Sequence, residues 1–252
     1  MKQILLDAPD QSEDAARVLQ AFIHEHTEPG VGGSEEGPSP DVAFAIEALG
    51  KAVPHALHIV RLPKRNLQGV NLGGMTLRYA TFSGSILRRV NLQFSVLNGG
   101  YLDGVDATGA IFRHASLARV GLSDANLSVC LLDFADFTAA RMDKADLTGA
   151  QAEGAIFLRA GLSRAKISGT FTRCDFRRAN LVDADLTAFS GPESDFQGAR
   201  LRGANLTAAD LSTARGLTVD QVLEARISGS TLLPEYLRAD ERVVRSVRPA
   251  ES

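Results

Sequence analysis

Tryptophan is absent from the 252-residue sequence, cysteine occurs twice, and aromatic residues make up only 6% of the chain. Two cysteines cannot provide the several bridges of a small disulfide-stabilised protein, so we expect a cytoplasmic chain. No apolar run approaches the roughly 18 residues that a membrane-spanning helix requires, and the acidic N-terminal segment is not typical of a signal peptide. These absences predict a protein without membrane contact.

Recognisable catalytic and cofactor motifs are also missing. The stretch "GVGGSEEG" lacks the Lys-Ser/Thr pair that follows the glycines of a phosphate-binding loop. His55 and His58 form a pair without further ligands, which favours solvated histidines over a zinc site. No serine lies in a nucleophile-elbow context. We therefore predict no catalytic residue, no metal and no cofactor, and we do not expect an enzyme.

The sequence does contain a period of five residues. In "ARLRGANLTAADL", Leu201, Leu206 and Leu211 are five apart, and the alanines two positions before them keep the same step. A helix turns about 100° per residue, and a strand alternates its faces, so neither element places every fifth side chain on one buried side. The pattern requires a different architecture.

This pattern runs from Leu62 to Leu211, with one residue lost near position 170. Each pentad reads A-(D/N)-L-x-x: a small position, an Asx position, a central position and two turn positions. The Asn and Asp side chains are expected to hydrogen-bond nearby backbone in the turns. Cys130 and Cys174 occupy small positions, which predicts buried thiols.

These repeats resemble the pentapeptide-repeat family. The resemblance implies an all-β solenoid over residues 60–215, a right-handed quadrilateral β-helix of about eight coils. In such a coil every twentieth residue shares a face, so Phe137, Phe157, Phe176 and Phe196 should stack, after correction for the lost residue. The stretch "AFSGPESDF" (188–196) departs from the repeat and is expected to bulge out as a loop.

The two ends of the solenoid should be covered by other elements, because an open coil exposes unpaired backbone groups. Residues 1–59 are expected to form a two-helix cap, one helix starting at Ser12 and a second running from Pro40 to a stop at Gly50, with a Gly/Pro-rich linker between them. Residues 216–252 should form a helix capped by Thr218, followed by a flexible tail after residue 238.

Charge bears on the function that the resemblance implies. The family includes gyrase-binding proteins that imitate duplex DNA and confer inhibitor resistance, and that dimerise through a C-terminal helix. Here residues 60–215 carry 14 acidic and 19 basic residues, whereas residues 1–59 carry ten acidic and three basic ones. A DNA mimic should have an acidic rod, because topoisomerase clefts are basic. Under this alternative, the strip of the rod that would imitate DNA consists of Asp103, Asp124, Asp143 and Asp183.

A second surface carries aromatic side chains. Phe94, His114 and Phe134 are twenty residues apart, and Ile111 and Leu131 occupy Asx positions beside them. An aromatic ladder near arginines is typical of a docking surface, although scattered apolar side chains and solvated arginines would give the same spacing. The predicted partner-binding residues are Phe94, Ile111, Arg113, His114, Leu131 and Phe134.

The sequence therefore favours a non-catalytic module that binds a protein partner through one face of the β-helix. The alternatives are a DNA-mimicking partner of DNA gyrase and, third, an enzyme or scaffold in a biosynthetic pathway. We expect no direct nucleic-acid binding. The resemblance to the gyrase-binding proteins also implies a homodimer through the C-terminal helix as an alternative to a monomer.

Overall fold

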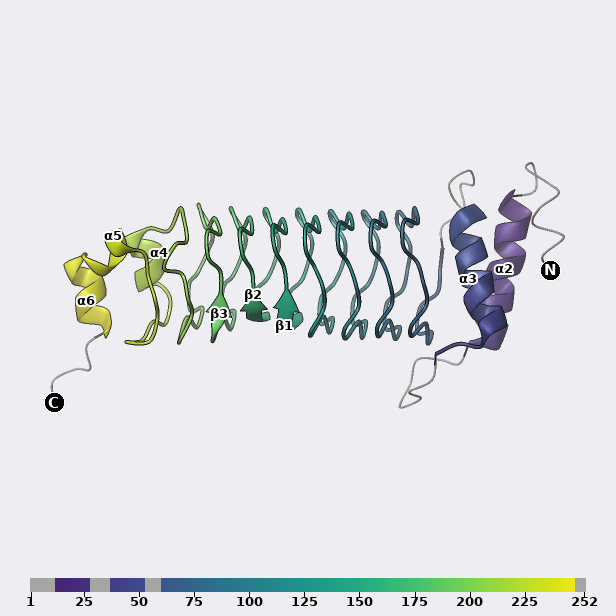
Figure 1. The fold of residues 1–252 in the computed structure, drawn as a ribbon, viewed down its shortest axis with the longest axis horizontal. Coiled ribbons are helices and arrows are strands. Elements are labelled where there is room, and N and C mark those ends of the chain that lie inside the picture. Colours follow the sequence, from purple (N-terminus) through teal and green to yellow (C-terminus); the bar gives the residue numbers. More distant parts are fainter. Residues whose placement is uncertain (1–11, 28–36, 53–59, 248–252) are drawn as a thin grey trace.

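A computed structural model describes residues 12–27, 37–52 and 60–247 of the chain. These residues form a rod with helices at both ends (Figure 1). Helices α2 (Ser12–His26) and α3 (Pro40–Ala52) lie at the N-terminal end. The rod contains short strands β1 (Asp146–Gln151), β2 (Lys166–Thr170) and β3 (Phe189–Ser190). The C-terminal end carries α4 (Val219–Leu223), α5 (Glu235–Arg238) and α6 (Glu241–Val247).

Backbone hydrogen bonds between consecutive coils build the rod. Asn91 pairs in parallel with Asn71 on one side and with Ile111 on the other, each twenty residues away. The Leu92 N–H donates to the Ile111 carbonyl at 2.7 Å, and the Asn91 N–H donates to the Val70 carbonyl at 3.1 Å. Four such ladders run along the rod because each coil contains four pentads. The predicted β-helical solenoid is confirmed.

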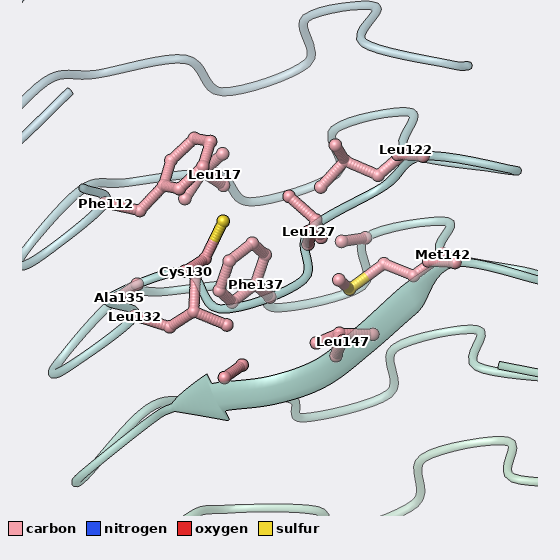
Figure 2. Close-up of a cluster of buried hydrophobic side chains, with 14 of the residues drawn as sticks. Phe112, Leu117, Leu122, Leu127, Cys130, Leu132, Ala135, Phe137, Met142 and Leu147 are labelled. Carbon is pink, nitrogen blue, oxygen red and sulfur yellow. The ribbon is translucent and has the colours of Figure 1, made fainter. Parts of the chain in front are cut away.

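The core lies inside the coils, where the central and small positions point (Figure 2). The predicted phenylalanine stack is confirmed, with ring centroids 5.1 Å apart for Phe137–Phe157, 4.9 Å for Phe157–Phe176 and 5.0 Å for Phe176–Phe196. Identical rings stack well because the coil spacing of about 4.8 Å is close to the ring separation. Inward-facing side chains therefore pack in columns.

Both cysteines are buried thiols, as predicted. The Cys130 Sγ donates to the Ala107 carbonyl at 3.0 Å. Burial raises the pKa of Cys130 and that of Cys174 from 9.0 to about 12. With such a pKa each thiol stays protonated near neutral pH. Because only the thiolate acts as a nucleophile or a metal ligand, these two side chains serve packing.

The Asx positions shape the turns, which confirms their predicted role. The Asn91 Oδ1 accepts the Gln93 N–H at 3.0 Å, and the Asp136 Oδ1 accepts the Thr138 N–H at 2.9 Å. The chain then bends through two turn residues, and the second of these has a positive φ on nearly every pentad. That second turn position points outward, so it determines what each face presents to a partner.

The lost residue falls where the sequence placed it. Ile156 pairs with Asp175, nineteen residues away, whereas Asp136 pairs with Ile156 at the usual twenty. The register shifts between Thr148 and Ala150 of β1, opposite Gly169. Gly169 has φ +117°, and a Cβ there would collide with the Ala150 carbonyl oxygen. Only glycine allows this coil to close with one residue fewer.

The predicted loop at residues 188–196 is wrong, because the pentad pattern continues through it. Gly191 takes the central position without a side chain, and Phe189 fills the vacated interior from the preceding small position, where it is fully buried. A Cβ on Gly191 would collide with the Phe189 ring. Ser194 takes the next small position and donates to the Phe171 carbonyl at 2.6 Å. The two positions have exchanged large and small residues.

Side chains of helix α2 hydrogen-bond backbone groups of the first coil, which has no preceding coil to pair with. The Gln20 Oε1 accepts the Arg61 N–H at 3.0 Å. The Arg65 guanidinium donates to the His24 Nδ1 at 2.7 Å, so the His24 Nε2 carries the proton and donates to the Arg61 carbonyl at 2.8 Å. Helix α3 differs from its prediction, because it continues past Gly50 to Ala52.

At the other end, Thr218 caps α4 as predicted, and Gln221 completes a capping box. Where the sequence predicts a flexible tail, the structure has α6. This helix buries Val243, and the Arg242 Nη1 lies 3.3 Å from the Asp220 Oδ1 of α4. The sequence did not predict this helix because a single buried apolar side chain and one ion pair give no periodic pattern among the surrounding charged residues.

The exchange of Phe189 and Gly191 predicts a strong coupling between the two sites. Phe189→Ala should cost about 3–5 kcal/mol of unfolding free energy because it leaves a cavity. Gly191→Leu alone should cost about 1–3 kcal/mol or more through its collision with the ring. The double variant restores the ordinary repeat and should return to within about 1.5 kcal/mol of the natural protein. Chemical denaturation of all four proteins measures the cycle, and additive losses would contradict the exchange.

Candidate functional site

The structure brings Phe94, His114 and Phe134 together in an outward-facing aromatic ladder. Ring centroids are 5.0 Å apart between Phe94 and His114 and 5.0 Å apart between His114 and Phe134, with interplanar angles of 10° in both pairs. All three residues occupy the second turn position, with φ between 56° and 60°. Phe94 is 59% exposed and Phe134 is 50% exposed. The ladder is therefore an ordered aromatic surface.

Glycines bound the ladder at both ends. The same column continues as Gly74 on one side and Gly154 on the other, with φ values of 70° and 62°. A Cβ on Gly154 would lie 2.8 Å from a ring carbon of Phe134, so this ring covers the Gly154 turn. Glycine is the least strained residue at such a turn, and bulky residues there require compensation. Stacking of the three rings provides this compensation, because each stacked pair contributes about 0.5–1.5 kcal/mol of stability in addition to the burial of apolar surface.

Ile111 and Leu131 lie beside the ladder and extend its apolar surface. They pair with each other across adjacent coils and are half-buried. The preceding Asx positions of this face hold Asn71 and Asn91. On this face, apolar residues replace the usual turn-forming amides at Ile111 and Leu131, next to His114 and Phe134.

Arg113 lies on the same face but is held in an ion pair that the sequence did not reveal. Its Nε donates to the Asp133 Oδ2 at 2.8 Å, and the Asp133 Oδ1 accepts the Glu153 N–H at 3.0 Å. Glu153 in turn pairs with Arg173. A chain of alternating charges thus runs alongside the ladder. The period of twenty between Arg113 and Asp133 was the signal that could have identified the pair.

The four aspartates of the predicted acidic strip also share one face, but cations interrupt them. The Asp124 Oδ1 lies 3.8 Å from the Lys144 Nζ. The Asp103 carboxylate and the Arg141 guanidinium both lie over Gly121, because a Cβ placed on Gly121 would be 2.6 Å from an Asp103 oxygen and 3.1 Å from an Arg141 nitrogen. This face is therefore a mixed-charge surface rather than a continuous line of carboxylates.

Residues 12–27, 37–52 and 60–247 contain no group of three or more His, Cys, Asp or Glu side chains that could hold a metal ion. His55 and His58 lie outside the described residues. None of the helices in these segments has the length and apolarity needed to cross a bilayer.

Sequence comparison agrees with the geometry. The family model for pentapeptide repeats matches in eight copies between residues 66 and 215, more than half of the chain; the matched segments are 66–99, 85–124, 101–133, 121–157, 130–169, 162–190 and 192–215. The protein belongs to the pentapeptide-repeat family. No curated protein matches this pentapeptide-repeat chain in sequence.

Two solved structures of other pentapeptide-repeat proteins are among the matches. A trypsin-treated form of QnrB1, a plasmid-mediated fluoroquinolone resistance protein, is 17% identical, with a TM-score of 0.50 over 68% of this chain and 92% of QnrB1. HetL, involved in heterocyst differentiation regulation in the cyanobacterium Nostoc, is 22% identical, with a TM-score of 0.28 over 71% of this chain and 87% of HetL. At these identities the likeness to QnrB1 concerns the fold alone.

The packing of Phe134 over Gly154 generates a prediction with a matched control. Gly154→Ala and Gly104→Ala both place alanine at a positive φ, 62° and 65°, but nothing lies within 4 Å of a Cβ at Gly104. Both variants should lose about 1–2 kcal/mol from the turn. Gly154→Ala should also displace the Phe134 ring, which NMR would register as an altered ring-current shift at His114. Unchanged His114 shifts in Gly154→Ala would contradict the ladder geometry.

Proposed function

We propose that this protein is a non-catalytic interaction module that binds a protein partner through the aromatic ladder of Phe94, His114 and Phe134. The proposal takes the rod as the right-handed, four-sided helix of about eight coils that the repeats predict. The observation that carries it is the exposure of two phenylalanines in an ordered stack. Exposed aromatic clusters of this kind are typical of protein interfaces.

Preorganisation supports the proposal physically. Binding usually costs free energy because side chains at the interface lose rotamer freedom. Here the three rings are already fixed by stacking, and the coils beneath them are held by backbone hydrogen bonds such as that from the Phe94 N–H to the Arg113 carbonyl at 3.0 Å. A partner therefore meets a rigid surface and gains most of the free energy of apolar burial.

The surroundings of the ladder indicate what the partner presents. Ile111 and Leu131 favour an apolar or aromatic side chain opposite the rings, since they add apolar surface on one side. The ion pairs of Arg113 with Asp133 and of Arg173 with Glu153 balance the charge along this face. A partner with mixed polar groups at its rim fits this surface better than one with a strong charge of either sign.

Affinity capture with a double variant tests the proposal. Phe94→Ser with Phe134→Ser should abolish capture of the partner from a cell lysate, because both exposed rings are removed. The melting temperature should fall by only a few degrees, because two stacked ring pairs are lost but neither ring contributes to the buried core. Quantitative mass spectrometry of the captured proteins, beside a thermal unfolding scan, measures both effects.

Tyr79→Ser is the matched control for this experiment. Tyr79 is 58% exposed at the same turn position of a neighbouring column, with φ 59°, and its ring covers Gly99 as Phe134 covers Gly154. Capture should persist in this variant. Loss of the partner in both variants, or in neither, would contradict a binding site at the ladder.

Modulation of DNA gyrase is the second candidate. Its support is the fold shared with the fluoroquinolone resistance protein QnrB1 and the position of Asp103, Asp124, Asp143 and Asp183 on one face. The pairing of Asp124 with Lys144 and the excess of basic residues in the rod weigh against it. We therefore rank it below the ladder.

A supercoiling assay with purified gyrase decides this candidate. Titration with the protein, with and without a quinolone, should leave supercoiling unchanged if the ladder serves an unrelated partner. Inhibition or protection that fades with added salt would instead support the gyrase candidate, because screening weakens a charge-dominated contact. Substitution of Asp103 and Asp143 by Asn should then remove the effect, while the Phe94→Ser, Phe134→Ser variant should retain it.

A further inference from the structure

Two arginines on consecutive coils have no counter-ion among the residues that the structure describes. Arg159 and Arg178 both occupy the second turn position, with φ 57°, and the Arg159 N–H donates to the Arg177 carbonyl at 3.0 Å, which places the two turns side by side. Within residues 12–27, 37–52 and 60–247, neither guanidinium has a hydrogen-bond acceptor or a carboxylate within ion-pairing distance. Two like charges on adjacent coils therefore repel each other without compensation.

Some other cations of the rod are paired with a carboxylate on the next coil. Lys144 pairs with Asp124, Arg173 pairs with Glu153, and both partners are twenty residues away in the sequence. In the column of Arg159 and Arg178, the neighbouring turn positions hold Ala139 and Gly198. No acidic side chain lies there to balance the charge, and the small residues leave open space instead.

That space is a cavity of about 470 Å³. Its lining consists of Leu158, Arg159, Arg177, Arg178, Gln197 and Gly198. Arg177 is already engaged, since its Nε and Nη2 donate to the two oxygens of Asp175 at 2.9 and 2.7 Å. The Arg177 Nε also lies 3.9 Å from the Asp195 Oδ2, so two carboxylates hold this guanidinium. The cavity thus presents one fixed guanidinium beside Asp175 and Asp195, two guanidiniums without a counter-ion among the described residues, and the apolar side chain of Leu158.

We propose that this cavity binds the phosphate dianion of a small phosphate monoester. Near neutral pH such a group carries a charge of about −1.5 to −2, which matches the two unpaired guanidiniums, whereas one carboxylate would balance only one of them. Its three terminal oxygens suit the forked donors of arginine. Leu158 supplies a wall for the organic part, and the cavity volume lies within the range of about 300–1,000 Å³ typical of ligand sites.

Calorimetric titration of the full chain with phenyl phosphate tests this site. Arg159→Ala and Arg178→Ala should each weaken binding about tenfold or more, because each removes a charge-assisted contact. Arg178→Lys should weaken it less, since the charge is kept and the fork is lost. Thermal unfolding of each variant should stay close to that of the natural protein, because both side chains are on the surface.

Arg89→Ala is the matched control. Arg89 has the same turn position, with φ 55°, and lies beside Arg88, whose Nε donates to Asp106 at 2.6 Å. Its column neighbours are Gly69 and Gly109, so it lacks a second unpaired guanidinium. Phenyl phosphate binding should be unaffected. Equal losses in Arg89→Ala and Arg178→Ala, or saturable binding in neither the natural protein nor any variant, would overturn the proposal.

Two further titrations identify the source of the dianion. Inorganic phosphate should bind more weakly than phenyl phosphate, because it makes no contact with Leu158; equal affinity would overturn the assignment to an ester. Binding of phenyl phosphate should weaken below the second phosphate pKa of about 6, as the ligand becomes a monoanion. Sulfate, which stays a dianion, should keep its affinity at that pH, and a parallel loss would overturn the charge-matching argument.

Discussion

The structure depends on the hydrogen bonds that join each coil to the next. The Leu92 N–H donates to the Ile111 carbonyl and the Leu97 N–H donates to the Ser116 carbonyl, so each residue lies next to the one twenty positions earlier, or nineteen where the coil is one residue shorter. Side chains at the same position of consecutive coils therefore lie in one column. Like residues in a column stabilise the rod when they pack well and destabilise it when they repel each other. The buried phenylalanines from Phe137 to Phe196, the exposed ladder and the unpaired arginines are three outcomes of this constraint.

The period of five made most of the rod predictable from sequence. It placed Cys130 inside, Asn91 in a turn and Phe94 above His114, because each follows from position alone. The pattern failed where two positions compensate each other. Phe189 fills the interior that Gly191 leaves empty, and a rule that assigns one size to each position interprets that pair as a break.

The missed features of the surface have a similar origin. The pairing of Arg113 with Asp133 depends on which turn residues meet across adjacent coils, and the pattern within a single pentad does not indicate this. Applied to Arg159 and Arg178, with the lost residue included, the twenty-residue step would have indicated two like charges in one column. Short helices such as α6 have no comparable repeat, and their contacts with α4 came only from the structure.

Inward-facing columns form the core, and we propose that recognition takes place at one outward-facing column, the ladder. Site-specific photo-crosslinking tests it most directly, with a benzophenone amino acid at position 134 and, as the comparison, at position 79. Both positions hold exposed aromatic residues on the same turn geometry. The account predicts that the partner captured by the natural protein crosslinks at position 134 and not at position 79. Crosslinks at position 79 alone would contradict it.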